Sequence, residues 1–93
     1  MAEVLCESVS QGMRRDERTV CVRDAVTSDR SFVRVETEFL TLKDGKYYLP
    51  VGVVQDEPQQ GLVLVELPQA PDEGAWRLWV RISDLLPAET VGA

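Results

Sequence analysis

The stretch from Tyr47 to Leu67 constrains the fold of this chain more than any other part of the sequence. It contains two runs rich in valine and leucine, and the polar break Asp-Glu-Pro-Gln-Gln-Gly separates them. Such a pattern is typical of a β-hairpin, and Pro58 and Gly61 suit the turn between its strands. We therefore expect the chain to be organised around a central hairpin in a small β-sheet.

Further strands are expected on both sides of this hairpin. The six predicted strands span residues 3–9, 18–26, 31–42, 47–55, 62–67 and 76–82. Asp44 and Gly45 form the pair that favours a type I′ turn, and they join the third strand to the fourth. Pro50 cannot donate a ladder hydrogen bond, so the fourth strand must lie at an edge, be bulged or be interrupted there. Together with Gly52, it suggests a bend that carries the strand from one sheet to the other.

The second and third strands are expected to pair around a turn at Ser28-Asp29. In that register Val22 lies opposite Val35 and Val20 lies opposite Thr37. One face then carries Val20, Val22, Val26, Val33, Val35 and Phe39, and the other carries Thr19, Cys21, Arg23, Arg34, Glu36 and Glu38. The separation of apolar from polar residues supports this register.

The fifth and sixth strands pair well when Val65 is placed opposite Leu78. The core face then carries Val63, Val65, Leu67, Trp76, Leu78 and Val80. The other face places Glu66 across from Arg77, Leu64 across from Trp79 and Leu62 across from Arg81. Ser83 is positioned to cap a helical turn over residues 84–86 that ends at Pro87.

Five to six short antiparallel strands and one late helical turn predict an all-β fold, either a small barrel or two packed sheets. An SH3-like barrel is the first choice and an OB-like barrel is the alternative. We expect a single domain over residues 1–87 and a flexible tail over residues 88–93. Architecture at this level does not imply a function.

Composition excludes several classes of function. The net charge of −6 argues against sequence-independent binding to nucleic acid, which depends on lysine and arginine. The chain lacks an apolar run long enough to cross a bilayer and lacks the pattern of a signal peptide, so we expect a cytoplasmic protein that does not enter a membrane. It has no histidine and no Cys-x-x-Cys pair, so we expect no metal site and no cofactor.

Trp79 is the leading candidate for a binding residue. The strand alternation places it between Arg77 and Arg81 on the face away from the core, beside Leu64. Tryptophan and arginine are enriched in the residues that dominate protein–protein binding energy. The alternative is that Trp79 only covers Leu64 and Leu62 and closes the outer surface of the sheet.

Tyr47 and Tyr48 are the other candidate binding residues. They are consecutive in a strand, so one must face inward and the other outward. The outward tyrosine either extends an aromatic patch toward Trp79, as in the peptide-binding grooves of small β-barrels, or stands alone.

Cys6 and Cys21 form a candidate redox pair. If the first hairpin is symmetric about Met13-Arg14, Cys6 lies opposite Cys21 at a Cα separation of about 4.5–5.5 Å, which a disulfide can span. Neighbouring arginine would favour the thiolate. The alternative is that both cysteines are small, unreactive core residues in a reducing cytoplasm.

Catalysis has little support in the sequence. The absence of histidine excludes Ser-His and Cys-His nucleophiles. Two acidic pairs, Asp56-Glu57 and Asp72-Glu73, fall in expected turns, where carboxylates are usually solvated. The leading hypothesis is a non-catalytic module that binds a protein partner or its own copy through an aromatic and arginine face. The alternatives are a protein with a redox-responsive thiol pair and, third, a small metal-assisted enzyme.

Overall fold

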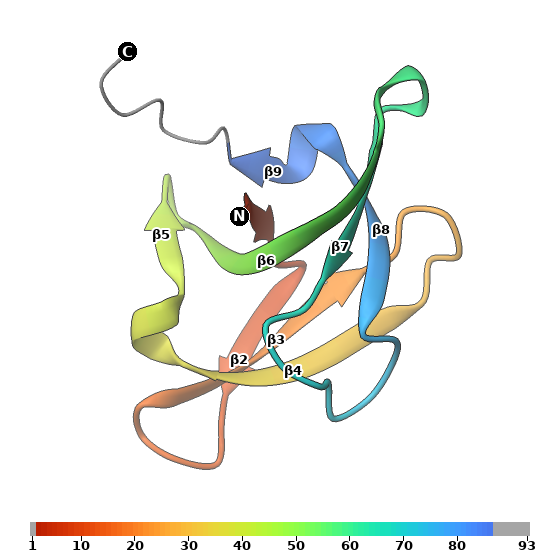
Figure 1. Cartoon of the computed structure of the whole chain (residues 1–93). Coiled ribbons are helices and arrows are strands. Elements are labelled where there is room, and N and C mark those ends of the chain that lie inside the picture. Colours follow the sequence, from red (N-terminus) through yellow and green to blue (C-terminus); the bar gives the residue numbers. More distant parts are fainter. Residues whose placement is uncertain (1, 87–93) are drawn as a thin grey trace.

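The computed structural model describes residues 2–86, and most of these residues lie in β-strands (Figure 1). The strands are β1 (Ala2–Leu5), β2 (Ser8–Gln11), β3 (Glu17–Arg23), β4 (Arg30–Glu36), β5 (Thr41–Lys43), β6 (Lys46–Glu57), β7 (Leu62–Glu66), β8 (Arg77–Arg81) and β9 (Leu85–Leu86). Three short 3-10 helices join them: η1 (Thr37–Phe39), η2 (Pro58–Gln60) and η3 (Ile82–Asp84). The tail expected over residues 88–93 lies outside the described residues, as does Pro87.

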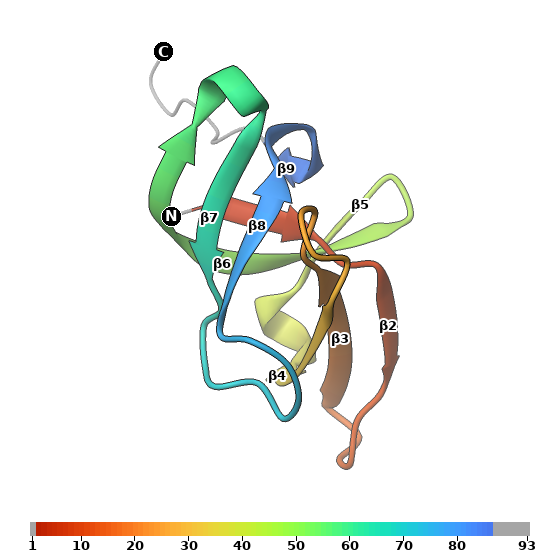
Figure 2. The ribbon, with the colours of Figure 1, turned by 90° about the vertical axis from the view of Figure 1, so that its right-hand side faces the viewer.

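The strands form two antiparallel sheets, which confirms the all-β class (Figure 2). The larger sheet has the order β8-β7-β6-β1-β9, and β5 also pairs with β6. The smaller sheet has the order β2-β3-β4. Within residues 2–86 the strand pairing leaves both sheets open, so the arrangement is two packed sheets and not a closed barrel.

The hydrophobic core lies between the two sheets. It consists of Val4, Cys6, Val20, Val22, Val33, Val35, Leu49, Val51, Val63, Val65, Leu67, Leu78 and Val80, which come from both sheets. Valine dominates because a β-branched side chain packs well on a pleated surface. Each such side chain contributes about 1.5–3 kcal/mol when it is fully buried.

The pairing of β3 with β4 differs from the expected register by four residues. Val20 lies opposite Val33 and Val22 lies opposite Ser31, so both expected pairs are wrong. The cause is a compact loop after Arg23, in which the Asp24 carboxylate accepts hydrogen bonds from the N–H groups of Val26 and Thr27 at 2.7 and 2.9 Å. The shift is an even number of residues, so the core face of both strands is unchanged.

Two of the long expected strands are divided. Residues 3–9 form β1 and β2, because the N–H of Cys6 bonds to Tyr47 in the larger sheet while the N–H of Glu7 bonds to Cys21 in the smaller one. Residues 31–42 form β4, η1 and β5. Val26 and Phe39, which were expected in the core, lie outside strands and are 60% and 57% exposed.

Strand β6 runs the length of the larger sheet and arches across the molecule (Figure 1). One edge of β6 pairs with β1, and the other pairs first with β5 up to Tyr48 and then with β7 from Gly52. The carbonyl of Tyr47 faces β1, so alternation directs the missing N–H of Pro50 into the gap between β5 and β7. The expected interruption at Pro50 is thus confirmed on that edge, and β6 pairs with β1 and β5 around this point and with β7 after it.

The register of β7 with β8 agrees with the sequence-based expectation. Val65 lies opposite Leu78, Leu64 opposite Trp79 and Glu66 opposite Arg77. Trp76 was placed in the core by its position in the alternation, and this was wrong. It precedes β8 and is 50% exposed, and its indole N–H donates to the carbonyl of Leu67 at 3.0 Å.

The helical turn near the C-terminus exists but begins one residue earlier than its expected cap. It is η3, which spans Ile82–Asp84, and no side chain caps its N-terminus. Ser83 therefore lies inside the turn and does not have the capping role expected of it.

Candidate functional site

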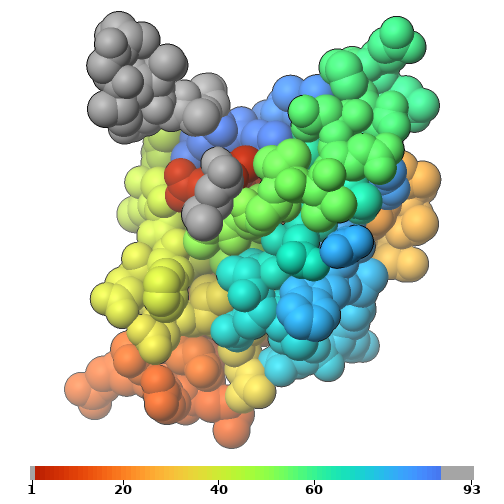
Figure 3. Space-filling model, in the orientation of Figure 1, coloured from red at the N-terminus to blue at the C-terminus, as the bar shows by residue number. Residues whose placement is uncertain are grey.

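A groove lies between the smaller sheet and the stretch of β6 whose edge is paired with neither β5 nor β7. Its apolar section has a volume of about 420 Å³ and is lined by Phe39, Pro50, Val51, Gly52, Glu66, Leu67 and Pro68. Its polar section has a volume of about 340 Å³ and is lined by Arg14, Glu17, Arg34, Val35, Glu36, Phe39, Pro50, Pro68 and Gln69. The two sections share Phe39, Pro50 and Pro68, so they form one continuous groove. It opens between the yellow segment that contains η1 and the turquoise segment that follows β7 (Figure 3).

Phe39 reaches the groove because η1 interrupts the chain between β4 and β5. Thr37 anchors this turn, since its N–H and its hydroxyl both donate to the carbonyl of Asp16, at 2.7 and 2.9 Å. The N–H of Leu40 closes the turn on the carbonyl of Thr37 at 3.1 Å. A continuous strand would bury Phe39 by alternation, whereas the 3-10 turn leaves it exposed.

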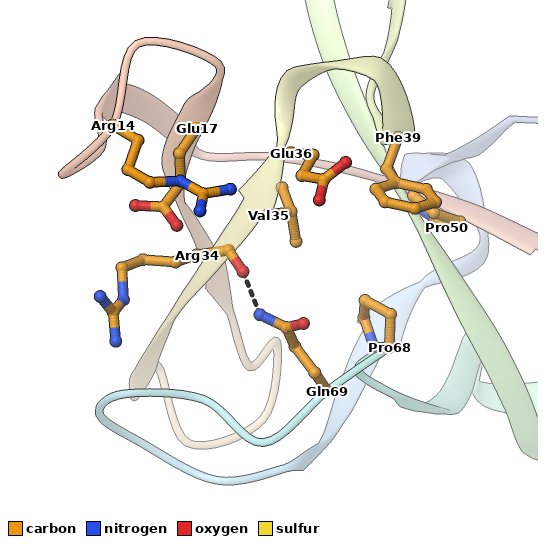
Figure 4. Close-up of a pocket in the computed structure, with 9 residues that line it drawn as sticks. All are labelled: Arg14, Glu17, Arg34, Val35, Glu36, Phe39, Pro50, Pro68 and Gln69. Atoms are coloured by element: carbon orange, nitrogen blue, oxygen red, sulfur yellow. Dashed lines mark hydrogen bonds between the residues drawn. The ribbon is translucent and has the colours of Figure 1, made fainter.

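Two prolines give the groove a rigid wall. Pro50 lies in β6, beside the gap between β5 and β7. Pro68 lies in the loop after β7. Figure 4 shows the ring of Phe39 beside Pro50, with Pro68 facing them across the groove. Proline fixes its own φ and loses little entropy when a ligand binds, so this wall is preorganised.

The polar end of the groove contains carboxylates and arginines in close proximity (Figure 4). Arg34 points away from the apolar section and forms a bidentate pair with Asp72, with Nε to Oδ2 at 2.6 Å. Gln69 donates to the carbonyl of Arg34 and holds the loop after β7 against β4. Glu36 points toward Phe39. A hydrogen bond with Glu38, then burial, and then repulsion from Glu38 and Asp16 raise the pKa of the Glu36 carboxyl.

Trp79 lies on the outer face of the larger sheet, as the alternation indicated, but it is half-buried. Leu64 in β7 lies directly opposite Trp79. A hollow of about 260 Å³ beside Trp79 is lined by Trp79, Val26, Leu62, Glu57 and Gln60. Its flanking residues Arg77 and Arg81 are exposed, and Arg77 pairs with Glu66 at 3.2 Å. Trp79 therefore partly covers the sheet and partly borders an open surface.

Tyr47 and Tyr48 do not join the surface around Trp79. They lie in the first part of β6, which pairs with β1 and β5. Trp79 lies in β8, and β7 lies between β8 and the later part of β6. Tyr47 packs against the core, and Tyr48 is half-buried. The structure does not bring the expected aromatic patch together.

Cys6 and Cys21 are both buried free thiols. Ser8, and not Cys6, lies opposite Cys21, so the expected register of the first hairpin is wrong. Burial and then repulsion from Cys21 raise the pKa of Cys6 to about 12. Burial and then the hydrogen bond to Glu7 raise the pKa of Cys21 to about 11. Such thiols are almost fully protonated near neutral pH and react slowly.

The acidic pairs do not form a metal site within residues 2–86, where no group of three or more potential metal ligands occurs. Asp72 is held by Arg34, and Glu73 forms a backbone bridge to Phe32. Asp56 and Glu57 lie in β6 and not in a turn, because the strand extends farther than expected.

Sequence reasoning missed the residues that build the groove. Phe39 was assigned to the core, and Pro68 was treated as part of a loop. Pro50 gave the one available signal, since a proline inside a strand pattern indicates a break in pairing on one edge. Nothing local in the sequence indicated which segments would line that break.

Comparisons with protein-family models, curated proteins and solved structures found no significant match for this chain. In the part of the chain that the structure describes, no helix is long and apolar enough to cross a membrane.

Proposed function

We propose that this chain is a non-catalytic module that binds an extended segment of a protein partner in the groove lined by Phe39, Pro50 and Pro68. The observation that carries the proposal is the groove itself, which has an exposed aromatic ring, two prolines and a continuous apolar surface. Grooves lined by aromatic and proline side chains bind extended peptides by burying alternate side chains. Its two sections, of about 420 and 340 Å³, each lie within the range of ligand sites and fit a few side chains.

The chemistry available in the chain supports a binding role over a catalytic one. The sequence contains no histidine, and burial keeps the two thiols protonated. The arginine and aspartate nearest to the groove neutralise each other in the pair of Arg34 with Asp72. These groups position the loop after β7 and leave the apolar surface as the main feature of the site.

An SH3-like arrangement is part of the same proposal. The three-stranded sheet, the long arched strand β6 and the 3-10 turn η3 between β8 and β9 support it. Small β-folds of this kind use one rim for recognition and the remainder for stability.

The test is a selection of random 12-residue peptides displayed on phage against the folded protein. Enriched peptides are then synthesised, and their affinities are measured by fluorescence anisotropy for the wild type and two variants. Phe39→Ala removes the exposed ring of the groove. Leu42→Ala is the matched control, because Leu42 is 61% exposed, close to the 57% of Phe39, and lines neither section of the groove.

We expect the enriched peptides to lose at least tenfold in affinity on Phe39→Ala and less than twofold on Leu42→Ala. Amide chemical shifts in a peptide titration should change most at Val51, Gly52 and Leu67. Failure to enrich any peptide would refute the proposal. Peptides whose binding depends on Trp79 and not on Phe39 would place the binding site on the outer face of the larger sheet instead. If the protein self-associates with increasing concentration and Phe39→Ala abolishes this, the occupant of the groove is a second copy of the chain.

A further inference from the structure

The groove changes in character along its length. The apolar section ends at Phe39, Pro50 and Pro68, and the polar section continues from the same three residues toward β4 and the β2–β3 hairpin. A ligand that fills both sections must therefore place an apolar group and a polar group close together (Figure 4). The charges of the polar section determine which polar group this is.

Both arginines of the polar section already have acidic partners. Arg34 pairs with Asp72 at 2.6 Å and points away from the apolar section. Arg14 lies 3.7 Å from Asp16. An anionic group in the groove would compete with these carboxylates for both guanidiniums.

The carboxylates of the polar section are not balanced in the same way. Glu17 accepts a hydrogen bond from the N–H of Met13 at 2.9 Å and makes no ion pair within residues 2–86. Glu36 makes no ion pair in that range either; the carboxylates of Glu38 and Asp16 repel its carboxylate, and the guanidinium of Arg14 attracts it less strongly. Two neighbouring carboxylates repel each other, and a cation placed between them and the groove relieves this repulsion.

The edge of β6 adds a backbone group to the site. Pro50 presents a carbonyl and no N–H on one edge of β6, at the point between its pairing with β5 and its pairing with β7. An extended segment lying along this gap can donate an N–H to that carbonyl, as an added strand does. This contact orients a ligand along the groove and brings its side chains to both sections.

We propose that the groove selects an extended protein segment in which a lysine or arginine lies within four residues of a large apolar side chain. The apolar side chain packs against Phe39, Pro50 and Pro68, and the cation lies at Glu36. The inference rests on the function proposed above and specifies the chemistry of its partner. The net charge of −6 favours the same partner at longer range, since it attracts basic segments.

The test uses the peptides from the phage selection and one additional pair of variants. Glu36→Gln removes the carboxylate that faces the groove. Asp56→Asn is the matched control, because it makes the same change in net charge at an exposed position outside both sections of the groove. Each peptide is also synthesised with its basic residue replaced by glutamine, which completes a double-mutant cycle with Glu36.

We expect basic residues to be enriched within four positions of the apolar residue. Glu36→Gln should weaken the basic peptide by about threefold to tenfold, leave the glutamine peptide within twofold, and act more strongly at low salt. Asp56→Asn should change either affinity less than twofold. Peptides that depend on Phe39 but show no preference for a basic residue would overturn this inference and leave the proposed function standing. Equal effects of Glu36→Gln and Asp56→Asn would also overturn it, because the charge effect would then be non-specific.

Discussion

Replacing Asp24 with asparagine is expected to destabilise this protein far more than its position in a surface loop suggests. Asp24 is 7% exposed. Its Oδ1 atom accepts the N–H groups of Val26 and Thr27 at 2.7 and 2.9 Å, and its Oδ2 atom accepts the N–H of Trp79 in β8 at 3.1 Å. The carbonyl of Trp79 also accepts the N–H of Ala25 at 2.7 Å. One carboxylate thus shapes the β3–β4 loop and attaches the smaller sheet to the edge of the larger one.

The magnitude follows from these three hydrogen bonds. Asparagine keeps an oxygen for Val26 and Thr27, but its NH2 group would face the N–H of Trp79, so that contact is lost. A hydrogen bond to a charged group contributes about 1.5–3 kcal/mol, and we expect Asp24→Asn to cost that amount. Asp24→Ala should cost about 3–5 kcal/mol, because all three donors lose their partner. Water can partly replace the carboxylate at the N–H groups of Val26 and Thr27, whose hydrogen bonds to it are only partly buried, and this limits the loss.

The effect should also depend on pH in a defined direction. Burial alone would raise the pKa of the Asp24 carboxyl, but the N–H groups of Thr27, Trp79 and Val26 outweigh it and lower the pKa below its usual value. The stabilisation is therefore fully present above the ordinary aspartate pKa of about 4 and is lost as the pH falls through the lower folded-state value. The free-energy difference between wild type and Asp24→Asn should shrink over that range.

The assay is urea denaturation followed by tryptophan fluorescence at several pH values between neutrality and acid. Asp29→Asn is the control, since Asp29 lies in the same loop and its carboxylate makes no hydrogen bond or ion pair in the described structure. It should change the free energy of unfolding by less than about 0.5 kcal/mol. Equal stability of the Asp24→Asn and Asp29→Asn variants would refute the assignment of Asp24 as the link between the sheets.

Two further predictions concern a glycine and the thiols. Gly74→Ala should strongly lower the melting temperature, because φ is +95° there and a Cβ would clash with the carbonyl oxygen of Arg30. Gly52→Ala, with open space around its Cβ position, should change the melting temperature little, and equal effects of the two substitutions would contradict this packing. Cys6 and Cys21, with pKa values raised to about 12 and about 11, should react with iodoacetamide at neutral pH at least a hundredfold more slowly in the native protein than in urea. Rapid modification of the native protein, measured by intact mass, would show that the thiols are accessible and would favour the redox hypothesis.

Local sequence signals identified the turns and one pair of strands. Asp44 and Gly45 form the expected left-handed turn, with φ values of +53° and +77°. The register of β7 with β8 follows from the match of apolar and polar residues across two short strands, whatever the length of the connection. The same matching kept the core face of β3 and β4 correct even though their register was wrong.

The failures share a cause, since each depended on hydrogen bonds that the alternation of residues along a strand does not encode. The β3–β4 register was set by Asp24, whose third partner is Trp79, 55 residues away in the sequence. Phe39 left the core because Thr37 bonds to the carbonyl of Asp16. Trp76 lies outside the core, with its indole N–H donating to the carbonyl of Leu67 at 3.0 Å.

The sequence by itself determined the all-β class, the turn residues and the faces of the core strands, because alternation and turn chemistry act over neighbouring residues. Only the tertiary structure decided where the candidate groove lies. Its walls come from η1, β6 and the loop after β7. They meet because Pro50 lacks the N–H that would let β5 and β7 cover the edge of β6 continuously. Pro50 signals this break locally, but nothing local in the sequence indicates which distant segments line it.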